Sequence, residues 1–171
     1  MSLRLTGGRA RGRVLREPVP RGVRPTSARV REALFSLIGQ DLEGQRVLDA
    51  FGGSGLLGLE AWSRGAEVTL YEVDRRAVQA LRRRGDQVGA EWAVRQGDVL
   101  LAARHLSPFD GVLADPPYGT SPERVLSVLG PLAARWLVLE TDARSDVPEE
   151  AGALRLDRMR EYGGTKLWVY R

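Results

Sequence analysis

The chain has 171 residues, of which 43% are hydrophobic, and carries a formal net charge of +4. Its length suits one domain with a sizeable core. Because it has no cysteine, disulfides, a thiol nucleophile and Cys-based metal sites are excluded. Its single histidine, His105, excludes a metal site with several histidines. No apolar run is long enough to span a membrane and the arginine-rich start lacks a signal-peptide core, so we expect a cytoplasmic protein with no membrane partner and no metal.

The first predicted element is a basic hairpin. Residues 1–31 contain nine arginines and one acid, a net charge of +8, whereas the remainder is −4. Such one-sided charge is typical of a segment that binds a polyanion, although a solvated tail is the alternative. Apolar residues on both sides of Thr6-Gly7-Gly8 favour a hairpin. The proline-rich residues 17–25 predict an extended linker, so we divide the chain into 1–24, hairpin and linker, and 25–171, the main domain.

The main domain reads as alternating helices and strands. Its first helix begins at Thr26, as N-cap, and ends at Gly39. Strands are then predicted at 46–51, 67–72, 92–96, 111–114 and 137–141, with helices at 56–64, 74–84 (closed by Gly85), 99–106 and 122–129. Residues 154–162 and 166–170 flank Gly163-Gly164 and predict a closing antiparallel hairpin. This alternation predicts an α/β fold with a mostly parallel sheet and helices on both faces.

A glycine-rich loop follows the first strand. Gly52, Gly53 and Gly55 allow a tight turn and let a ligand approach the backbone, as in dinucleotide-binding loops. Asp49 precedes the glycines, where its charge would repel a pyrophosphate but would suit a ligand with an amino group. A turn that serves packing alone is the alternative.

Two further acids follow the next two strands. Glu72 stands 23 residues after Asp49, close to the spacing at which dinucleotide folds place a ribose-binding acid, and Asp74 reads as a helix N-cap. Asp98 can accept a hydrogen bond from an adenine amine while the Val99 amide pairs with a ring nitrogen, although Asp98 also fits a plain N-cap. Together the three acids fit a ligand with an amine, a ribose and an adenine but no phosphate, and S-adenosylmethionine is such a ligand.

The quartet Asp115-Pro116-Pro117-Tyr118 follows the strand at 111–114, at the sheet edge where open α/β folds bind ligands. If Asp115 and the Pro116 carbonyl both accept N–H bonds from a base amine, they draw its nitrogen toward tetrahedral geometry and stabilise the charge that grows on it. Tyr118 can stack on the base; a ring packed on the core is the alternative. We therefore predict Asp115, Pro116 and Tyr118 as catalytic residues.

At this point the chain resembles a known family, the RsmD-type 16S ribosomal RNA guanine-N2 methyltransferases, which are Rossmann-type amino-methyltransferases. The resemblance covers nearly the whole chain and is carried by residues 3–13, 24–35, 48–66 and 162–167. The quartet alone is shared by many DNA and RNA amino-methyltransferases, whereas the block at 24–35 is much more specific. Gly53 departs from the family's usual alanine.

The resemblance implies a seven-stranded sheet whose last strand is antiparallel, and it implies a cofactor, S-adenosylmethionine, with S-adenosylhomocysteine as product. It places Thr26 and Arg29 near the methionine end of that cofactor. The residues then expected at the cofactor are Thr26, Arg29, Asp49, Phe51, Gly52, Gly53, Gly55, Glu72, Val73, Asp98, Val99 and Asp115.

The resemblance also implies a target guanine in a hairpin loop of small-subunit RNA, with 16S rRNA or the small ribosomal subunit as partner. RNA is then the polyanion that the basic segment binds. We expect four arginines to bind it: Arg4, Arg9, Arg11 and Arg13. The oligomeric state stays open, with a monomer as the working expectation.

Three other functions remain as alternatives. The same chemistry could act on another RNA or on DNA adenine, which a transfer assay with each acceptor distinguishes. A dinucleotide-binding oxidoreductase leaves the quartet without a role and would bind NAD. A non-catalytic RNA-binding protein would not need the intact quartet and acids.

Overall fold

The computed structural model describes residues 3–16 and 26–171. Residues 1–2 and 17–25 lie outside the described part, and with them the predicted linker and the predicted boundary at residue 24. The described strands are β1 (Arg46–Asp49), β2 (Glu67–Glu72), β3 (Trp92–Gln96), β4 (Phe109–Ala114), β5 (Ala133–Asp142), β6 (Glu150–Ala151), β7 (Leu154–Tyr162) and β8 (Thr165–Tyr170). The described helices are α1 (Ala28–Ile38), α2 (Leu56–Ser63), α3 (Arg75–Val88), α4 (Val99–Ala102) and α5 (Pro122–Leu129), with short 3₁₀ turns at Ala103–His105 and Gly130–Leu132.

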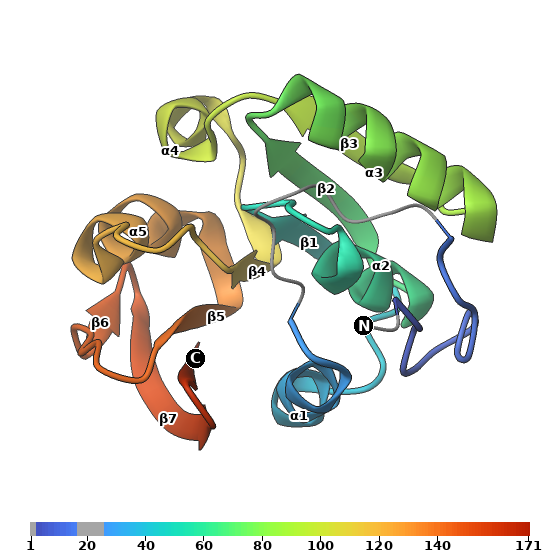
Figure 1. Ribbon diagram of the computed structural model, residues 1–171. Coiled ribbons are helices and arrows are strands. Elements are labelled where there is room, and N and C mark those ends of the chain that lie inside the picture. The colour runs from blue at the N-terminus through green and yellow to red at the C-terminus, as the bar shows by residue number, and fades with distance from the viewer. Residues whose placement is uncertain (1–2, 17–25) are drawn as a thin grey trace.

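These strands form one sheet in the order β3-β2-β1-β4-β5-β8-β7-β6 (Figure 1). The first five in this order pair in parallel, and β8 is antiparallel to both β5 and β7. The predicted class, a Rossmann-type sheet that is mostly parallel with an antiparallel end, is confirmed. The count is eight rather than seven because the two-residue strand β6 pairs with β7; such a short strand has no periodicity to read in the sequence.

Apolar side chains cover both faces of the sheet because successive residues of a strand point to opposite sides. Val47 joins the cluster that contains α1 and α2, whereas its neighbour Leu48 joins the cluster that contains α4 and α5. Both faces are thus buried, as a parallel sheet requires. Among the described residues, no helix is long and apolar enough to cross a membrane.

Two predicted helix ends are wrong. Helix α3 continues through Gly85 and ends at Gly89, whose left-handed φ of 70° closes it. Gly85 serves packing instead, because a Cβ there would collide with the indole of Trp92. Helix α1 is capped by Ser27, whose side chain accepts a hydrogen bond from the Val30 amide, and not by Thr26. Thr26 is thereby left for another role.

The N-terminal segment 3–16 forms the predicted hairpin and packs on the main domain. The Leu5 amide donates to the Arg13 carbonyl at 2.9 Å, and the Leu15 amide donates to the Leu3 carbonyl at 3.0 Å. Leu3, Leu5 and Leu15 are buried in the same core cluster as α1 and α2. The described part of this segment is therefore not a solvated tail.

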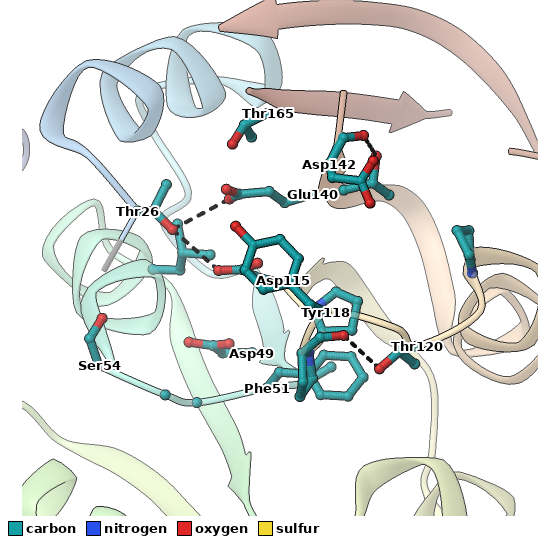
Figure 2. A pocket seen from close by; sticks show the side chains of 18 of the residues that line it. Thr26, Asp49, Phe51, Ser54, Asp115, Tyr118, Thr120, Glu140, Asp142 and Thr165 are labelled. Atoms are coloured by element: carbon teal, nitrogen blue, oxygen red, sulfur yellow. Dashed lines mark hydrogen bonds between the residues drawn. The ribbon is translucent and has the colours of Figure 1, made fainter. Parts of the chain in front are cut away.

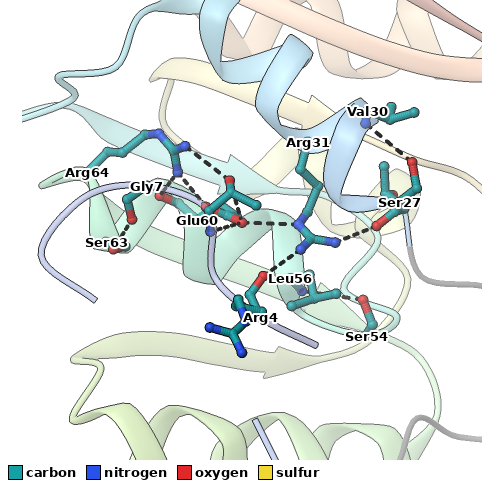
Figure 3. A network of polar contacts seen from close by, with 12 residues as sticks. Arg4, Gly7, Ser27, Val30, Arg31, Ser54, Leu56, Glu60, Ser63 and Arg64 are labelled. Atoms are coloured by element: carbon teal, nitrogen blue, oxygen red, sulfur yellow. Dashed lines mark hydrogen bonds and ion pairs between the residues drawn. The ribbon is translucent and has the colours of Figure 1, made fainter. Parts of the chain in front are cut away.

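A buried ion cluster ties this hairpin to α1 and α2 (Figure 3). The Glu60 carboxylate pairs with Arg31 at 3.1 Å and with Arg64 at 2.6 Å, and it also accepts from the Thr6 amide at 2.9 Å. Arg31 in turn donates to the Arg4 carbonyl at 2.7 Å. All three charged side chains are almost fully buried, so the loss of one would leave unpaired buried charge on the others. The cluster fixes the start of α1, and with it Thr26, relative to the sheet.

Candidate active site

The carboxyl ends of the parallel strands border a cavity of about 750 Å³, a volume typical of small-molecule sites (Figure 2). β1 ends at Asp49, β2 ends at Glu72, and the quartet directly follows β4, so parallel pairing brings their carboxylates to one edge. Most of the predicted site residues line this cavity: Thr26, Asp49, Phe51, Gly52, Gly53, Glu72, Val73, Asp98, Val99, Asp115, Pro116 and Tyr118.

Two predicted cofactor residues do not line it. Arg29 is exposed on α1 and borders a smaller adjoining hollow together with Ser27 and Tyr162. Gly55 precedes α2 with a left-handed φ of 75°, and a Cβ there would collide with Leu81. Gly55 therefore helps to shape the glycine-rich loop without lining the cavity. Direct contact of Arg29 or Gly55 with a cofactor stays a prediction.

The cavity wall is strongly acidic. Six carboxylates line it, and its described lining contains no lysine, arginine or histidine; the acids are Asp49, Glu72, Asp98, Asp115, Glu140 and Asp142. Such a wall attracts cations and repels a pyrophosphate. It therefore favours a positively charged ligand such as S-adenosylmethionine over a dinucleotide.

Asp49 is the most deeply buried of these acids, with 1% of its surface exposed. Its Oδ2 accepts the Gly58 amide at 2.9 Å, whereas its buried Oδ1 has no hydrogen-bond partner. Burial raises the pKa of Asp49 well above its usual range, the backbone amides of Gly58 and, more weakly, Phe51 partly offset this, and the negative charges of Asp115 and Glu72 add to it. A ligand ammonium would satisfy the unpaired oxygen, so this residue fits the amino group of S-adenosylmethionine.

Glu72 both holds the glycine loop and faces the cavity. Its Oε2 accepts the Gly53 amide at 2.9 Å and its Oε1 accepts the Asp74 amide at 2.9 Å. Asp74 is the N-cap of α3, as predicted, because its side chain accepts from Ala77. Val73, 64% exposed, presents an apolar surface beside Glu72. A carboxylate next to an apolar surface suits a ribose joined to a flat base.

Asp98 has the N-cap role that the sequence left as an alternative. Its Oδ1 accepts the Leu100 amide at 2.8 Å at the start of α4. The same residue lines the cavity together with Val99, so capping holds it in place at the wall. Its predicted bond to an adenine amine stays a prediction.

The quartet forms a turn at the cavity mouth. The Pro117 carbonyl accepts from the Thr120 hydroxyl at 2.8 Å and from its amide at 3.2 Å, which holds the turn in shape. Tyr118 is 79% exposed, so the alternative of a ring packed on the core is wrong. Its ring is available for a flat ligand, and Tyr118 and Asp115 both line the cavity (Figure 2).

Asp115 is joined to a residue that the sequence analysis missed, Glu140. The Thr26 hydroxyl lies 3.3 Å from Asp115 Oδ2 and 3.3 Å from Glu140 Oε2 (Figure 2). Burial raises the pKa of Asp115 to about 6, while the Thr26 hydroxyl acts in the opposite direction. Glu140 could have been found, because it stands near the carboxyl end of a predicted strand of the same sheet.

The raised pKa of Asp115 predicts a pH-dependent stability cost. Because its pKa is raised, the Asp115 carboxyl group adds to the free energy of unfolding below pH 4, where it is uncharged. This contribution is lost as the pH rises through about 6, because the folded state then holds a buried charge. Asp115→Asn should therefore raise the free energy of unfolding by about 3 kcal/mol at pH 7 and leave it nearly unchanged at pH 4. Denaturant titrations at both pH values check this, with Asp86→Asn on the exposed face of α3 as control; an equal gain at both values would contradict it.

Within residues 3–16 and 26–171, no cluster of His, Asp or Glu could hold a metal ion. The arrangement instead provides a buried carboxylate for an amine, a second acid for hydroxyls, and an exposed ring beside a carboxylate of raised pKa. Such a set has the chemistry to bind a cationic nucleoside and to position a base amine against it.

The comparisons with known proteins agree with this geometry. The family model described as Conserved hypothetical protein 95 matches residues 3–171. Ribosomal RNA small subunit methyltransferase D of Escherichia coli K12 is 40% identical over 119 residues, which make up 68% of this chain and 60% of that protein. Bacillus subtilis YlbH is 33% identical over 187 residues, covering 99% of this chain and 98% of that protein.

The solved structure of Escherichia coli yhhF superposes with a TM-score of 0.85 at 31% identity and covers 99% of this chain and 97% of its own. This agreement in fold extends over the hairpin as well as the sheet. Because the family model covers the described residues from the hairpin to the last strand, the chain belongs to this family, that of the RsmD-type methyltransferases, as its sequence predicted.

Proposed function

We propose that this protein transfers a methyl group from S-adenosylmethionine to the exocyclic N2 amine of a guanine in a loop of 16S ribosomal RNA. The observation that carries the proposal is the position of Asp115 and the exposed Tyr118 ring at the mouth of an acidic cavity. The Escherichia coli relative is a ribosomal RNA small subunit methyltransferase, which supports the choice of RNA. A cytoplasmic location follows from a ribosomal substrate.

The cofactor is held by residues of three strand ends. S-adenosylmethionine, when bound, supplies a methyl group activated by its sulfonium. Asp49 accepts the amino group through its unpaired Oδ1, and Glu72 accepts the ribose hydroxyls. Asp98 and the Val99 amide bind the adenine edge. The acidic wall attracts the cationic cofactor more strongly than S-adenosylhomocysteine, which has lost the sulfonium charge. This difference aids release of the product.

The acceptor base enters beside the quartet. Asp115 and the Pro116 carbonyl accept the two N–H bonds of the amine and direct its lone pair toward the methyl group. Stacking on Tyr118 contributes about 1–3 kcal/mol of binding. An RNA loop base can be splayed out to reach this position at modest cost.

The hairpin 3–16 supplies the RNA-binding charge, but its arginines are not equivalent. Arg9 lies over the Trp62 ring at 4.5 Å and donates to the Trp62 carbonyl at 3.0 Å, so it anchors the hairpin on α2. The side chains of Arg11 and Arg13 are exposed, with no hydrogen bond or ion pair to the described part of the chain. These two cations are the ones best placed to meet phosphates.

Replacing Arg11 and Arg13 together with serine should weaken RNA binding and lower the slope of log K against log salt by about 1.5, because each phosphate contact contributes about 0.7–0.9. Filter binding across a salt series measures this. Arg135→Ser with Arg155→Ser, two exposed cations on β5 and β7, is the matched control. An equal loss of slope in the control pair would remove the hairpin from the interface.

A transfer assay tests the function itself. Labelled S-adenosylmethionine is offered with naked 16S RNA, small ribosomal subunits or DNA, and the label is mapped in the acceptor. The proposal expects one labelled guanine in the RNA of either ribosomal acceptor. Label in DNA alone would assign the quartet to adenine chemistry, and binding of NAD without any transfer would refute the methyltransferase activity.

A further inference from the structure

One hydroxyl lies between two carboxyl groups at the active site. Thr26 Oγ1 is 3.3 Å from Asp115 Oδ2 and 3.3 Å from Glu140 Oε2. A threonine hydroxyl carries a single hydrogen and accepts through its lone pairs. Its hydrogen therefore serves one carboxyl group at a time or is shared between the two, while the lone pairs of Oγ1 can accept a proton from either acid.

The hydroxyl is held firmly in this place. Thr26 is 8% exposed, and its carbonyl accepts from the guanidinium of Arg31. Arg31 is itself fixed by its buried ion pair with Glu60 (Figure 3). The position of Oγ1 between the two acids is therefore built into the fold from the side of α1 and α2.

We propose that Thr26 and Glu140 form a proton relay that carries the amine proton from Asp115 away from the reacting nitrogen. This inference rests on the proposed function, since it needs an amine that loses a proton on methylation. Asp115 touches the base and is the catalytic residue; Thr26 and Glu140 act through it.

The relay follows methyl transfer. The amine nitrogen forms a bond to the methyl carbon as the carbon–sulfur bond breaks and leaves its electron pair on sulfur. The nitrogen then gives one proton to the Asp115 carboxylate. Asp115 passes a proton to Thr26 Oγ1 as the Thr26 hydroxyl gives its own to Glu140, so the carboxylate of Asp115 is restored. Glu140 releases the proton to water.

The electrostatic surroundings suit such a transfer. Burial raises the pKa of Asp115 to about 6, which allows it to take up a proton near neutral pH and to return it. The described titratable and charged groups around the pair, on the neighbouring strands, loops and helix, are Asp49, Glu72, Tyr118, Asp142, Tyr162 and Arg29. Acids predominate among them, so their charges favour the uptake of a proton by Asp115.

Three variants test the relay in the full-length protein. Thr26→Val removes the hydroxyl, Thr26→Ser retains it, and Glu140→Gln removes the terminal acceptor. We expect kcat to fall about tenfold in Thr26→Val and Glu140→Gln, with little change in KM for RNA, and Thr26→Ser to recover most of the loss. Added imidazole should raise kcat in Thr26→Val and not in wild type, because an external base replaces the relay. Glu67→Gln, an exposed acid at the start of β2, is the matched control.

A second measurement needs neither RNA nor cofactor. Carbon-13 NMR of the Asp115 carboxyl group in the free protein should show its apparent pKa raised by Thr26→Val, which removes a hydrogen-bond donor, and lowered by Glu140→Gln, which removes a neighbouring negative charge. Shifts of opposite sign are the result expected from a coupled pair bridged by Oγ1.

The relay would be overturned if both variants kept wild-type kcat and wild-type pH profiles while RNA methylation continued. A loss of kcat without rescue by Thr26→Ser or imidazole would also overturn it, since that pattern indicates a structural role. Absence of any methylation by the wild-type protein would instead refute the proposed function, while the NMR shifts would still report whether the two acids are coupled.

Discussion

Asp115→Ala is expected to lower the rate of methyl transfer about a thousandfold while the affinity for S-adenosylmethionine changes by less than about threefold. The reason is that Asp115 faces the acceptor amine in the proposed function, and a fixed group that stabilises charge growing in the transition state contributes about a hundred- to thousandfold in rate. Single-turnover kinetics with RNA and calorimetric titration of the cofactor measure the two quantities separately.

Asp115→Asn is the informative companion variant. It retains one accepting oxygen but cannot take up a proton, so we expect a rate between those of wild type and Asp115→Ala. Wild-type transfer by Asp115→Ala would remove Asp115 from the chemistry. An equally large loss of cofactor affinity would assign it to the cofactor site, beside Asp49, instead.

Asp49→Asn should weaken binding of S-adenosylmethionine about a hundredfold and at the same time stabilise the free protein. The unpaired Oδ1 of Asp49 gains a partner only when a ligand amine is bound, so the variant loses a buried charge-assisted bond. In the free protein the same buried carboxylate is a cost, because burial raises its pKa well above the usual range. Calorimetry and thermal unfolding measure the two effects.

Opposite signs in the two measurements are what distinguish this role from general damage to the fold. Asp86→Asn on the exposed face of α3 is the matched control and should change neither quantity. If Asp49→Asn bound the cofactor with wild-type affinity, Asp49 would not be the amine site. If it lost stability along with affinity, the carboxylate would be holding the Gly58 amide rather than awaiting a ligand.

The sequence predicted the parallel core and the position of the quartet at a strand end well, because both depend on local patterns. Apolar runs that end in an acid or a glycine mark buried strands and their carboxyl ends, and β2 and β3 coincide with the predicted ranges. Parallel pairing then requires those ends to meet. Asp49, Glu72 and Asp115 could thus be brought to one site without knowledge of any contact.

What the sequence did not predict depends on contacts between distant residues. Gly85 reads as a helix end, yet it lies inside α3 because Trp92, seven residues later, needs its space. Thr26 reads as an N-cap, yet Ser27 caps the helix and the Thr26 hydroxyl bonds to acids that follow about 90 and 114 residues later. Likewise, the sequence does not show that Arg9 packs on Trp62 whereas the side chains of Arg11 and Arg13 stay exposed.

An acceptor that lacks only the N2 amine of the target guanine shows whether that amine receives the methyl group. A 16S RNA fragment or reconstituted subunit is prepared with guanosine or with inosine at the mapped position, and the nucleosides are analysed by mass spectrometry after reaction. We predict N2-methylguanosine from the guanosine acceptor and no methylation of the inosine acceptor. Equal methylation of both would place the methyl group on another atom and contradict the role assigned to Asp115, Pro116 and Tyr118.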